Sequence, residues 1–359
     1  MRVLHVSDGY LPRLGGVERQ VHDLAVQQRV RGDEVWVATR TQGPPEPGTR
    51  RLGADRLRPS ALLRELSPDL VHCHSSVLSP LSWTFARAAT RAGLPVVVTM
   101  HSMVPTVGPV AAGLRVVARS VGAGAVWTAV SGVCASALRL AADVPVHVLH
   151  NGVDPQAWGP AATGGAVTTV SSVMRLASRK RPLPYVEVLG QVERELGIGA
   201  RWRAVIAGDG PQRDAVARSI RRHGLEHRVS LPGRLDRSEV EALMRQTGLY
   251  VAPAVLESFG IAALEARCAG VPVLAMRGAG VCEFVEHGMD GELVQDDHAM
   301  ADRLVELLGE GSRLAGLARG ARRPVVDQAW ATVIRRCADV YELAGACEAG
   351  RRQPVAHVE

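Results

Sequence analysis

Two glutamates in the second half of the chain, Glu257 and Glu265, stand eight positions apart around a glycine, Gly260, which we expect to open a helix. A helix start beside a glycine offers unpaired backbone amides and the positive end of the helix dipole to a diphosphate. If the intervening residues are helical, the second glutamate lies up to ~12 Å further along. The two carboxylates could therefore bracket an extended phosphorylated ligand. The alternative is a pair of solvated glutamates on a surface helix.

A second candidate site is a basic pair, Arg175 and Lys180, in a loop that follows an expected strand. Cations fixed beside a departing diphosphate stabilise the transition state more than the ground state, because the charge on the leaving group increases as its bond breaks. Lys180 is the only lysine among the 42 lysine and arginine residues of the chain. Because a compact ammonium is not equivalent to a planar guanidinium, a lysine at this place favours a specific role over a solvated loop.

The first half of the chain contributes a glycine pair and a histidine. Gly15 and Gly16 follow the first expected strand and begin a helix, an arrangement suited to anions that also fits a plain strand-to-helix turn. His101 directly follows another expected strand, where α/β sheets bind ligands, and a buried structural histidine is the alternative. Four further histidines also lie near expected strand ends: His72, His74, His147 and His150. Their spacing does not indicate a metal site, so we assign them no catalytic role.

Short apolar strands alternate with helical stretches along the whole chain, which is the pattern of parallel βαβ units. A turn-rich stretch separates two such series, and the strand pattern restarts after it. The sequence therefore predicts two Rossmann-like α/β domains that face each other across a cleft. The expected strands are 2–7, 34–39, 69–72, 95–99, 125–130 and 146–149 in the first series, and 167–173, 203–207, 228–231, 249–252 and 273–275 in the second.

The turn-rich stretch, 151–165, sets the expected domain boundaries. We predict an N-terminal domain, 1–153, and a C-terminal domain, 154–325. An amphipathic stretch near the end of the chain carries its apolar residues on one face, which predicts a last helix, 326–345, that crosses back to the first domain. The residues that follow, 346–359, are expected to form a tail.

The composition is that of a globular protein with sizeable cores, since 47% of the residues are hydrophobic and 22% are charged. The formal net charge of +6 is spread over the chain and only 4% of residues are aromatic, so we expect no nucleic-acid binding. Proline and glycine interrupt the longest uncharged run, 94–114, which argues against a transmembrane segment and leaves only a peripheral membrane contact open. Six cysteines without a CxxC pair, and a first segment that predicts a strand rather than a secretory signal, indicate a cytoplasmic protein.

Several of these segments resemble glycosyltransferase family 4, a family with the GT-B fold. The resemblance is strongest in 257–266 with 268–273, and 171–180 is similar to the family's arginine and lysine clamp. Further matches are Asn151-Gly152-Val153-Asp154, Gly208-Asp209-Gly210-Pro211 and Gly233-Arg234-Leu235-Asp236. Two positions depart from the pattern, because His150 stands where proline is common and Arg181 stands where glycine usually follows the lysine. The resemblance covers nearly the whole chain.

The resemblance implies a role for each candidate residue. Glu257 would orient the hydroxyls of a donor sugar, Glu265 would bind ribose hydroxyls, and Arg175 with Lys180 would hold the diphosphate. Phe259, Gly260 and Ile261 would offer main-chain amides to the donor, and Gly15 with Gly16 would approach the diphosphate. His101 would contact the donor sugar, and main-chain groups around Leu235 would contact the nucleotide base. The N-terminal domain would bind the acceptor and the C-terminal domain the nucleotide sugar.

The resemblance thus predicts transfer of a hexose-type sugar from a nucleotide diphosphate sugar, a UDP-sugar or GDP-sugar, to a hydroxyl of an acceptor that the sequence does not identify. It also implies that the anomeric configuration is retained. Since the sequence contains no DxD triplet to hold a metal ion, we expect transfer without a metal or another cofactor. Two alternatives stay open: a nucleotide-sugar epimerase of the same fold, and a non-catalytic nucleotide-sugar-binding protein.

Overall fold

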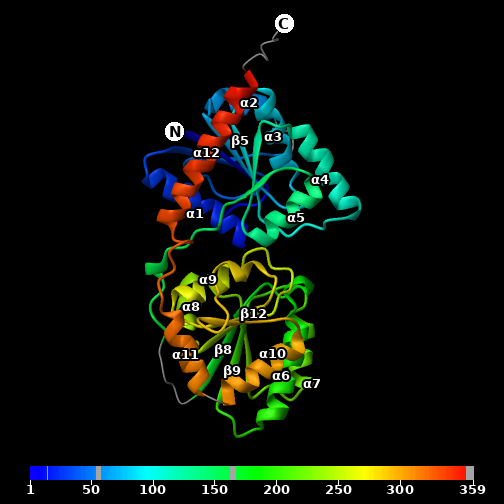
Figure 1. Ribbon diagram of the computed structural model, residues 1–359, viewed down its shortest axis with the longest axis vertical. Coiled ribbons are helices and arrows are strands. Elements are labelled where there is room, and N and C mark those ends of the chain that lie inside the picture. The colour runs from blue at the N-terminus through cyan, green and yellow to red at the C-terminus, as the bar shows by residue number, and fades with distance from the viewer. Residues whose placement is uncertain (14, 54–57, 162–166, 310, 353–359) are drawn as a thin grey trace. The chain divides into compact units, whose positions relative to one another are not determined.

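A computed structural model describes residues 1–13, 15–53, 58–161, 167–309 and 311–352 of the protein. The chain forms two compact units (Figure 1). Val153–Val326 make up the second unit, and Met1–Gly152 with the chain from Asp327 onward make up the first. Part of the predicted linker, 162–166, and part of the predicted tail, 353–359, lie outside the described residues. The cleft between the two domains stays a prediction.

The first unit is built on a parallel sheet with the strand order β3-β2-β1-β4-β5-β6-β7. Its strands are β1 (Arg2–Ser7), β2 (Glu34–Thr39), β3 (Thr49–Arg51), β4 (Leu70–Ser75), β5 (Val96–Met100), β6 (Ala125–Ala129) and β7 (Val146–Val148). The order of strands reverses between β1 and β4. The carboxyl ends of strands at such a switch point are where open α/β sheets bind ligands.

Helices cover both faces of this first sheet. The helices are α1 (Gly16–Val30), α2 (Pro59–Leu66), α3 (Pro80–Arg91), α4 (Gly108–Val121), α5 (Gly132–Ala142) and α12 (Trp330–Arg352). Helices α1 and α12 lie side by side on one face (Figure 1), and α2 to α5 pack against the other. Helix α12 extends beyond residue 345, where the sequence predicts the tail to begin.

The second unit has a second parallel sheet, with the order β10-β9-β8-β11-β12-β13. Its strands are β8 (Thr168–Val173), β9 (Trp202–Ala207), β10 (Val229–Gly233), β11 (Leu249–Ala252), β12 (Val273–Met276) and β13 (Gly291–Val294). Here the switch point lies between β8 and β11. The carboxyl edge of the sheet at this point is therefore the place where a sheet of this kind binds a ligand.

The helices of the second unit also cover both faces of its sheet. They are α6 (Pro182–Leu196), α7 (Arg213–Arg222), α8 (Arg237–Arg245), α9 (Ile261–Cys268), α10 (Asp297–Gly309) and α11 (Gly311–Ala321), with short 3₁₀ helices η2 (Pro155–Ala157), η3 (Ser178–Lys180) and η4 (Gly280–Glu283). Helices α6, α7, α10 and α11 enclose one apolar core. In the part of the chain that the structure describes, no helix is both long and apolar enough to cross a membrane.

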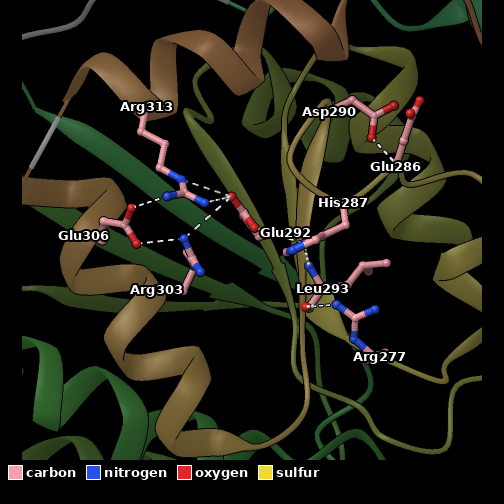
Figure 2. A network of polar contacts seen from close by, with 9 residues as sticks. All are labelled: Arg277, Glu286, His287, Asp290, Glu292, Leu293, Arg303, Glu306 and Arg313. Carbon is pink, nitrogen blue, oxygen red and sulfur yellow. Dashed lines mark hydrogen bonds and ion pairs between the residues drawn. The ribbon is translucent and has the colours of Figure 1, made fainter.

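The structure confirms every predicted strand, with boundaries shifted by a few residues, and adds β3 and β13. Strand β13 contains Glu292, a fully buried carboxylate. Its Oε1 accepts hydrogen bonds from Nε and Nη2 of Arg313 at 3.1 and 2.8 Å (Figure 2). Arg313 and Arg303 both pair with Glu306 as well. This network allows a charged residue to lie inside a strand, because a buried carboxylate is tolerated when it is paired.

Candidate active site

The two loops with the predicted charged residues leave the sheet of the second unit at its switch point. Strand β8 ends at Val173 and leads to Arg175 and Lys180, and β11 ends at Ala252 and leads to Glu257. The two strands are hydrogen-bonded neighbours in the sheet. Residues far apart in the sequence are thereby brought to one edge, at the place where the topology favours a ligand.

An ion pair joins the two loops. The ammonium of Lys180 donates a hydrogen bond to Oε2 of Glu257. The Lys180 side chain is 28% exposed and that of Glu257 is 12% exposed, so neither is sealed inside the protein. The pair therefore places a positive and a negative group side by side, within reach of a polar ligand.

The loop that carries Arg175 is held by the backbone of a neighbouring glycine-rich loop. The backbone amide of Leu176 donates to the carbonyl of Asp209 at 2.9 Å. A Cβ on Gly208 would lie 1.8 Å from the carbonyl oxygen of Met174, and one on Gly210 would lie 2.5 Å from the carbonyl oxygen of Leu176. These contacts explain the glycines after β9, because no side chain fits between the two loops. Arg175 itself is exposed.

The loop that carries Glu257 rests on a second close backbone contact. The amide of Gly280 donates to the carbonyl of Glu257 at 2.8 Å, and a Cβ on Gly280 would lie 2.2 Å from the carbonyl oxygen of Ser258. Phe259 is buried against Phe284, with the ring centroids 5.5 Å apart. Gly280 is not among the predicted site residues, although its place in a glycine-rich turn after an apolar strand is a usable signal.

Gly260 and the helix after it have the geometry that the sequence predicts. Gly260 is the N-cap of α9 with φ 95°, a left-handed conformation that favours glycine. Ile261 is the first residue of the helix, and Glu265 lies half-buried one turn later. The predicted amide donors therefore lie at a true helix start, where the positive end of the dipole favours an anion.

Tyr250 connects the two sides of this site, and the sequence analysis missed it. The hydroxyl of Tyr250 donates to the carbonyl of Val173 at 3.1 Å and accepts from the amide of the same residue at 3.2 Å. Burial raises the pKa of this hydroxyl, and the negative charges of Glu265 and Glu257 raise it further. Tyr250 thus fixes the end of β8 while lying close to both glutamates.

Leu235, the predicted base contact, lies between β10 and α8 and is half-buried. Asp236, which follows it, caps α8. The Asp236 side chain accepts from the amide of Glu239 at 2.9 Å, and the Glu239 carboxylate accepts from the amide of Asp236 at 2.7 Å. This reciprocal cap fixes the backbone next to Leu235.

Arg181 has the backbone conformation of the glycine that is usual at its position. Its φ is 59° and its ψ is 42°, in the left-handed region. Its guanidinium binds the carboxylate of Asp297 through two hydrogen bonds of 2.9 and 2.6 Å, and it also donates to the carbonyl of Pro253 at 3.3 Å. Arg181 therefore ties the end of η3 to α10 and to the end of β11, at the expense of local backbone strain.

Replacing Arg181 by alanine and by glycine should separate these two effects. Both variants lose the ion pair with Asp297, but only alanine keeps a side chain in the left-handed region. We expect the alanine variant to be less stable than the glycine variant by about 1 kcal/mol. Urea unfolding of both variants measures the difference, with Arg179→Ala as the matched control for loss of an arginine from η3. An alanine variant as stable as the glycine variant would contradict the strain.

In the first unit, Gly15 and Gly16 lie at the start of α1, as predicted. The carboxylate of Glu18 lies over this loop, because a Cβ on Gly15 would lie 2.2 Å from its Oε2 and a Cβ on Gly9 would lie 2.7 Å from its Oε1. Glu18 is buried and pairs with Nε of Arg13 at 3.1 Å. The structure thus places a negative group, with its own cation, beside the glycines predicted to approach a diphosphate.

His101 follows β5 at the carboxyl edge of the first sheet and is 8% exposed. Its Nε2 lies 3.0 Å from Nδ1 of His74. Burial lowers the pKa of His101 to about 4, so the ring is neutral at pH 7. With His72 and His74, His101 lines a small cavity of about 20 Å³ that also reaches Asn151. His101 is therefore buried and also lies at the edge where open α/β sheets bind ligands.

Two family models match the chain, one in each half. The model for Glycosyltransferase Family 4 matches residues 14–157, and the model for Glycosyl transferases group 1 matches residues 165–323. The glycogen synthase of Mycobacterium tuberculosis strain H37Rv is 26% identical over 99% of this chain and 97% of its own length. The D-inositol 3-phosphate glycosyltransferase of Xylanimonas cellulosilytica is 28% identical over 95% of this chain and 93% of its own length.

Solved structures share the fold of the whole chain. Anabaena Alr3699/HepE in complex with UDP and glucose superposes with a TM-score of 0.77 and 21% identity, over 96% of this chain and 100% of that one. Sucrose-phosphate synthase from Thermosynechococcus elongatus superposes with a TM-score of 0.79 and 19% identity, over the same shares. At these identities the likeness concerns the fold alone.

Proposed function

Because the chain belongs to glycosyltransferase family 4 and has the GT-B fold, we propose that this glycosyltransferase moves a hexose-type sugar from a uridine diphosphate sugar to an acceptor hydroxyl with retention of configuration. The choice of uridine rests on Alr3699/HepE, a structural neighbour that is described in complex with UDP and glucose. A guanosine diphosphate sugar is the second donor to test. We further propose that the transfer needs no metal ion.

The observation that carries the proposal is the pairing of Lys180 with Glu257 at the switch point of the second sheet. A donor sugar presents hydroxyl groups, which suit a carboxylate, next to a diphosphate, which suits an ammonium. A donor that binds here can meet Glu257 with its sugar and Lys180 with its diphosphate. The start of α9 at Ile261, which the chain reaches after Glu257, adds amide donors and a positive dipole end.

The family resemblance suggests the roles proposed for the other residues of the second unit. Arg175, which is exposed, is assigned to the diphosphate, and Glu265, one helical turn into α9, is assigned to the ribose hydroxyls. Leu235 is assigned to the base. In the first unit, Gly15, Gly16 and His101 stay predicted contacts of the donor.

In the proposed reaction, the acceptor hydroxyl attacks the anomeric carbon on the face from which the diphosphate leaves. The bond from that carbon to the diphosphate oxygen breaks, the bond to the acceptor oxygen forms, and the departing phosphate oxygen takes the acceptor's proton. Lys180 and Arg175 stabilise the charge that develops on the leaving group. The products are a glycoside with the donor's anomeric configuration and a nucleoside diphosphate.

A donor screen followed by product analysis tests the proposal. We expect UDP-glucose, present at a hundred times its dissociation constant, to raise the melting temperature of the protein by roughly 5–10 °C. With an accepted hydroxyl compound, NMR of the product should show the anomeric configuration of the donor. An inverted product would contradict retention, isomerisation of the donor without an acceptor would favour an epimerase, and binding without turnover over a broad acceptor panel would favour a binding protein.

A further inference from the structure

The first unit contains a chain of buried histidines that the sequence analysis did not recognise. Side chains alternate along a strand, and the register pairs His5 of β1 with His72 of β4, and His74 of β4 with Thr99 of β5. All four therefore lie on the sheet face that α1 and α12 cover, and all are buried. We call these residues, together with Gln28, His101, Thr128 and Tyr341, the histidine ladder.

One branch of the histidine ladder runs from α1 to His101. Oε1 of Gln28 lies 2.6 Å from Nε2 of His5. Nδ1 of His5 lies 2.9 Å from Nε2 of His74, and Nδ1 of His74 lies 3.0 Å from Nε2 of His101. The branch therefore connects a glutamine on a helix to the histidine at the ligand-binding edge through two imidazoles, each of which uses both ring nitrogens.

The second branch starts at the same glutamine and sets its orientation. Nε2 of Gln28 donates to the hydroxyl of Tyr341 at 2.9 Å, so that hydroxyl donates to Nδ1 of His72, also at 2.9 Å. Nε2 of His72 then donates to Oγ1 of Thr99 at 2.6 Å, and Thr99 pairs with Thr128 at 2.6 Å. Because this branch uses the amide nitrogen of Gln28 as a donor, the amide oxygen is left as the acceptor for His5.

The direction of the first branch follows from that acceptor. His5 must carry its proton on Nε2, so its Nδ1 accepts from Nε2–H of His74, and Nδ1 of His74 accepts from Nε2–H of His101. Each imidazole holds a single proton, because burial lowers the pKa of His5 and His101 to about 4 and that of His72 and His74 well below its usual value. A neutral imidazole with one proton has one donor and one acceptor nitrogen.

The nitrogens of His5, His72 and His74 come close enough to raise the question of a metal ion. Both ring nitrogens of each of these residues already have a hydrogen-bond partner. The facing nitrogens of His5 and His74 point at one another across 2.9 Å, which leaves no room for an ion between them. The arrangement is that of hydrogen-bonded imidazoles, not of a set of metal ligands.

We propose that Gln28, held by Tyr341, fixes the tautomer of His101 through His5 and His74, so that His101 carries its proton on Nε2 and its Nδ1 acts as a hydrogen-bond acceptor. Gln28 and Tyr341 are thus positioning residues. The consequence for transfer rests on the proposed function, in which His101 contacts the donor sugar: an acceptor nitrogen suits a sugar hydroxyl, whereas the other tautomer would present an N–H. The tautomer itself is independent of that function.

NMR of the imidazole nitrogens in the full-length protein labelled with ¹⁵N-histidine tests the inference directly. In the wild type we expect His5, His74 and His101 to be protonated on Nε2, with His101→Asn used to assign the His101 signals. In Gln28→Met, His5 loses its acceptor. Because a buried N–H without a partner is rarely tolerated, we expect all three rings to change to the Nδ1 tautomer together.

Gln20→Met is the matched control, because Gln20 lies on the same helix, is also buried, and binds only the backbone of Gly152 at 2.8 and 2.9 Å. We expect it to leave the three tautomers unchanged. Gln28→Glu keeps an oxygen acceptor for His5 and should keep the wild-type tautomers. In a transfer assay, Gln28→Met should lower kcat/KM by about tenfold.

The inference is overturned if His101 of the wild type carries its proton on Nδ1, or if Gln28→Met leaves the three tautomers as they are. The wild-type spectrum alone decides the matter if Gln28→Met does not fold. A protein with the expected tautomers but without transferase activity would refute the proposed function and leave the histidine ladder intact.

Discussion

Replacing Lys180 by alanine should lower the rate of sugar transfer roughly 10²- to 10³-fold while the protein stays folded. The ammonium lies at the switch point of the second sheet, paired with Glu257. In the proposed reaction, its loss removes a cation from the place where charge develops on the leaving diphosphate, and this affects the transition state more than the bound donor. We therefore expect a fall in kcat that exceeds any change in KM for the donor.

The replacement Lys180→Arg should recover only part of this loss. A planar guanidinium is larger than an ammonium and has a fixed hydrogen-bond geometry. The ammonium of Lys180 donates to the carboxylate of Glu257, and a guanidinium at the end of a longer side chain would present its donors in a different geometry. Initial rates with saturating acceptor compare the wild type with Lys180→Ala and Lys180→Arg. Arg179→Ala, which removes an exposed neighbour on the same turn, is the matched control. An active Lys180→Ala protein would contradict the assignment.

A chemical experiment uses the rarity of lysine. An amine-acylating reagent can modify only Lys180 and the N-terminal amine, because the chain has no other lysine. We expect modification of Lys180 to abolish transfer. A bound nucleoside diphosphate should protect Lys180 from the reagent, which mass spectrometry of the peptide that contains Lys180 can show. The N-terminal amine, paired with Asp33 in the first unit, serves as the internal control that the nucleotide should not protect.

The sequence predicts most strands because they are uninterrupted apolar runs between turn residues. Strand β3 escapes prediction because its three residues, Thr49 to Arg51, have no apolar alternation. Strand β13 escapes it for a different reason. Glu292 suggests exposure, and its burial becomes acceptable through its pairing with His287, Arg303 and Arg313, the last from a helix later in the chain. Pairings of this kind depend on the tertiary structure and leave little trace in local sequence.

The same distinction holds for the candidate site. Lys180 and Glu257 could be found from the sequence because Lys180 is the only lysine of the chain, because Glu257 precedes a glycine that opens a helix, and because both lie in segments that resemble the family. Tyr250 could not, because an aromatic residue inside a strand normally indicates only packing. The roles of His72 and His74 could not be found from the sequence either. Their polarity predicts the end of a strand, and only partners on neighbouring strands and on α12 make a neutral, buried chain of imidazoles.

Gly208 shows how the candidate site depends on a residue without a side chain. Its backbone amide donates to the carbonyl of Gly233 at 2.7 Å, and its φ of 132° is one that side chains rarely adopt. In Gly208→Ala the new Cβ would lie 1.8 Å from the carbonyl oxygen of Met174. Because this oxygen belongs to the backbone, it cannot rotate out of the way as the end of a side chain could. The loop with Arg175 must therefore move.

We expect Gly208→Ala to lower the free energy of unfolding by about 3 kcal/mol, from backbone strain and overpacking together. It should also lower kcat/KM for the donor by roughly 10²-fold, because displacing a group that holds the substrate by about 1 Å has an effect of that size. Gly197→Ala is the matched control, since Gly197 also has a positive φ, 76°, but nothing within 4 Å of its Cβ position.

The control variant should lose only about 1 kcal/mol of stability and keep its transferase activity. Urea unfolding and donor-saturation kinetics on the two variants then separate the effect of backbone strain, which both share, from the effect of the collision with Met174, which only Gly208→Ala suffers. If the two variants were equally stable and equally active, the contact between the two loops would not be what holds Arg175 in place.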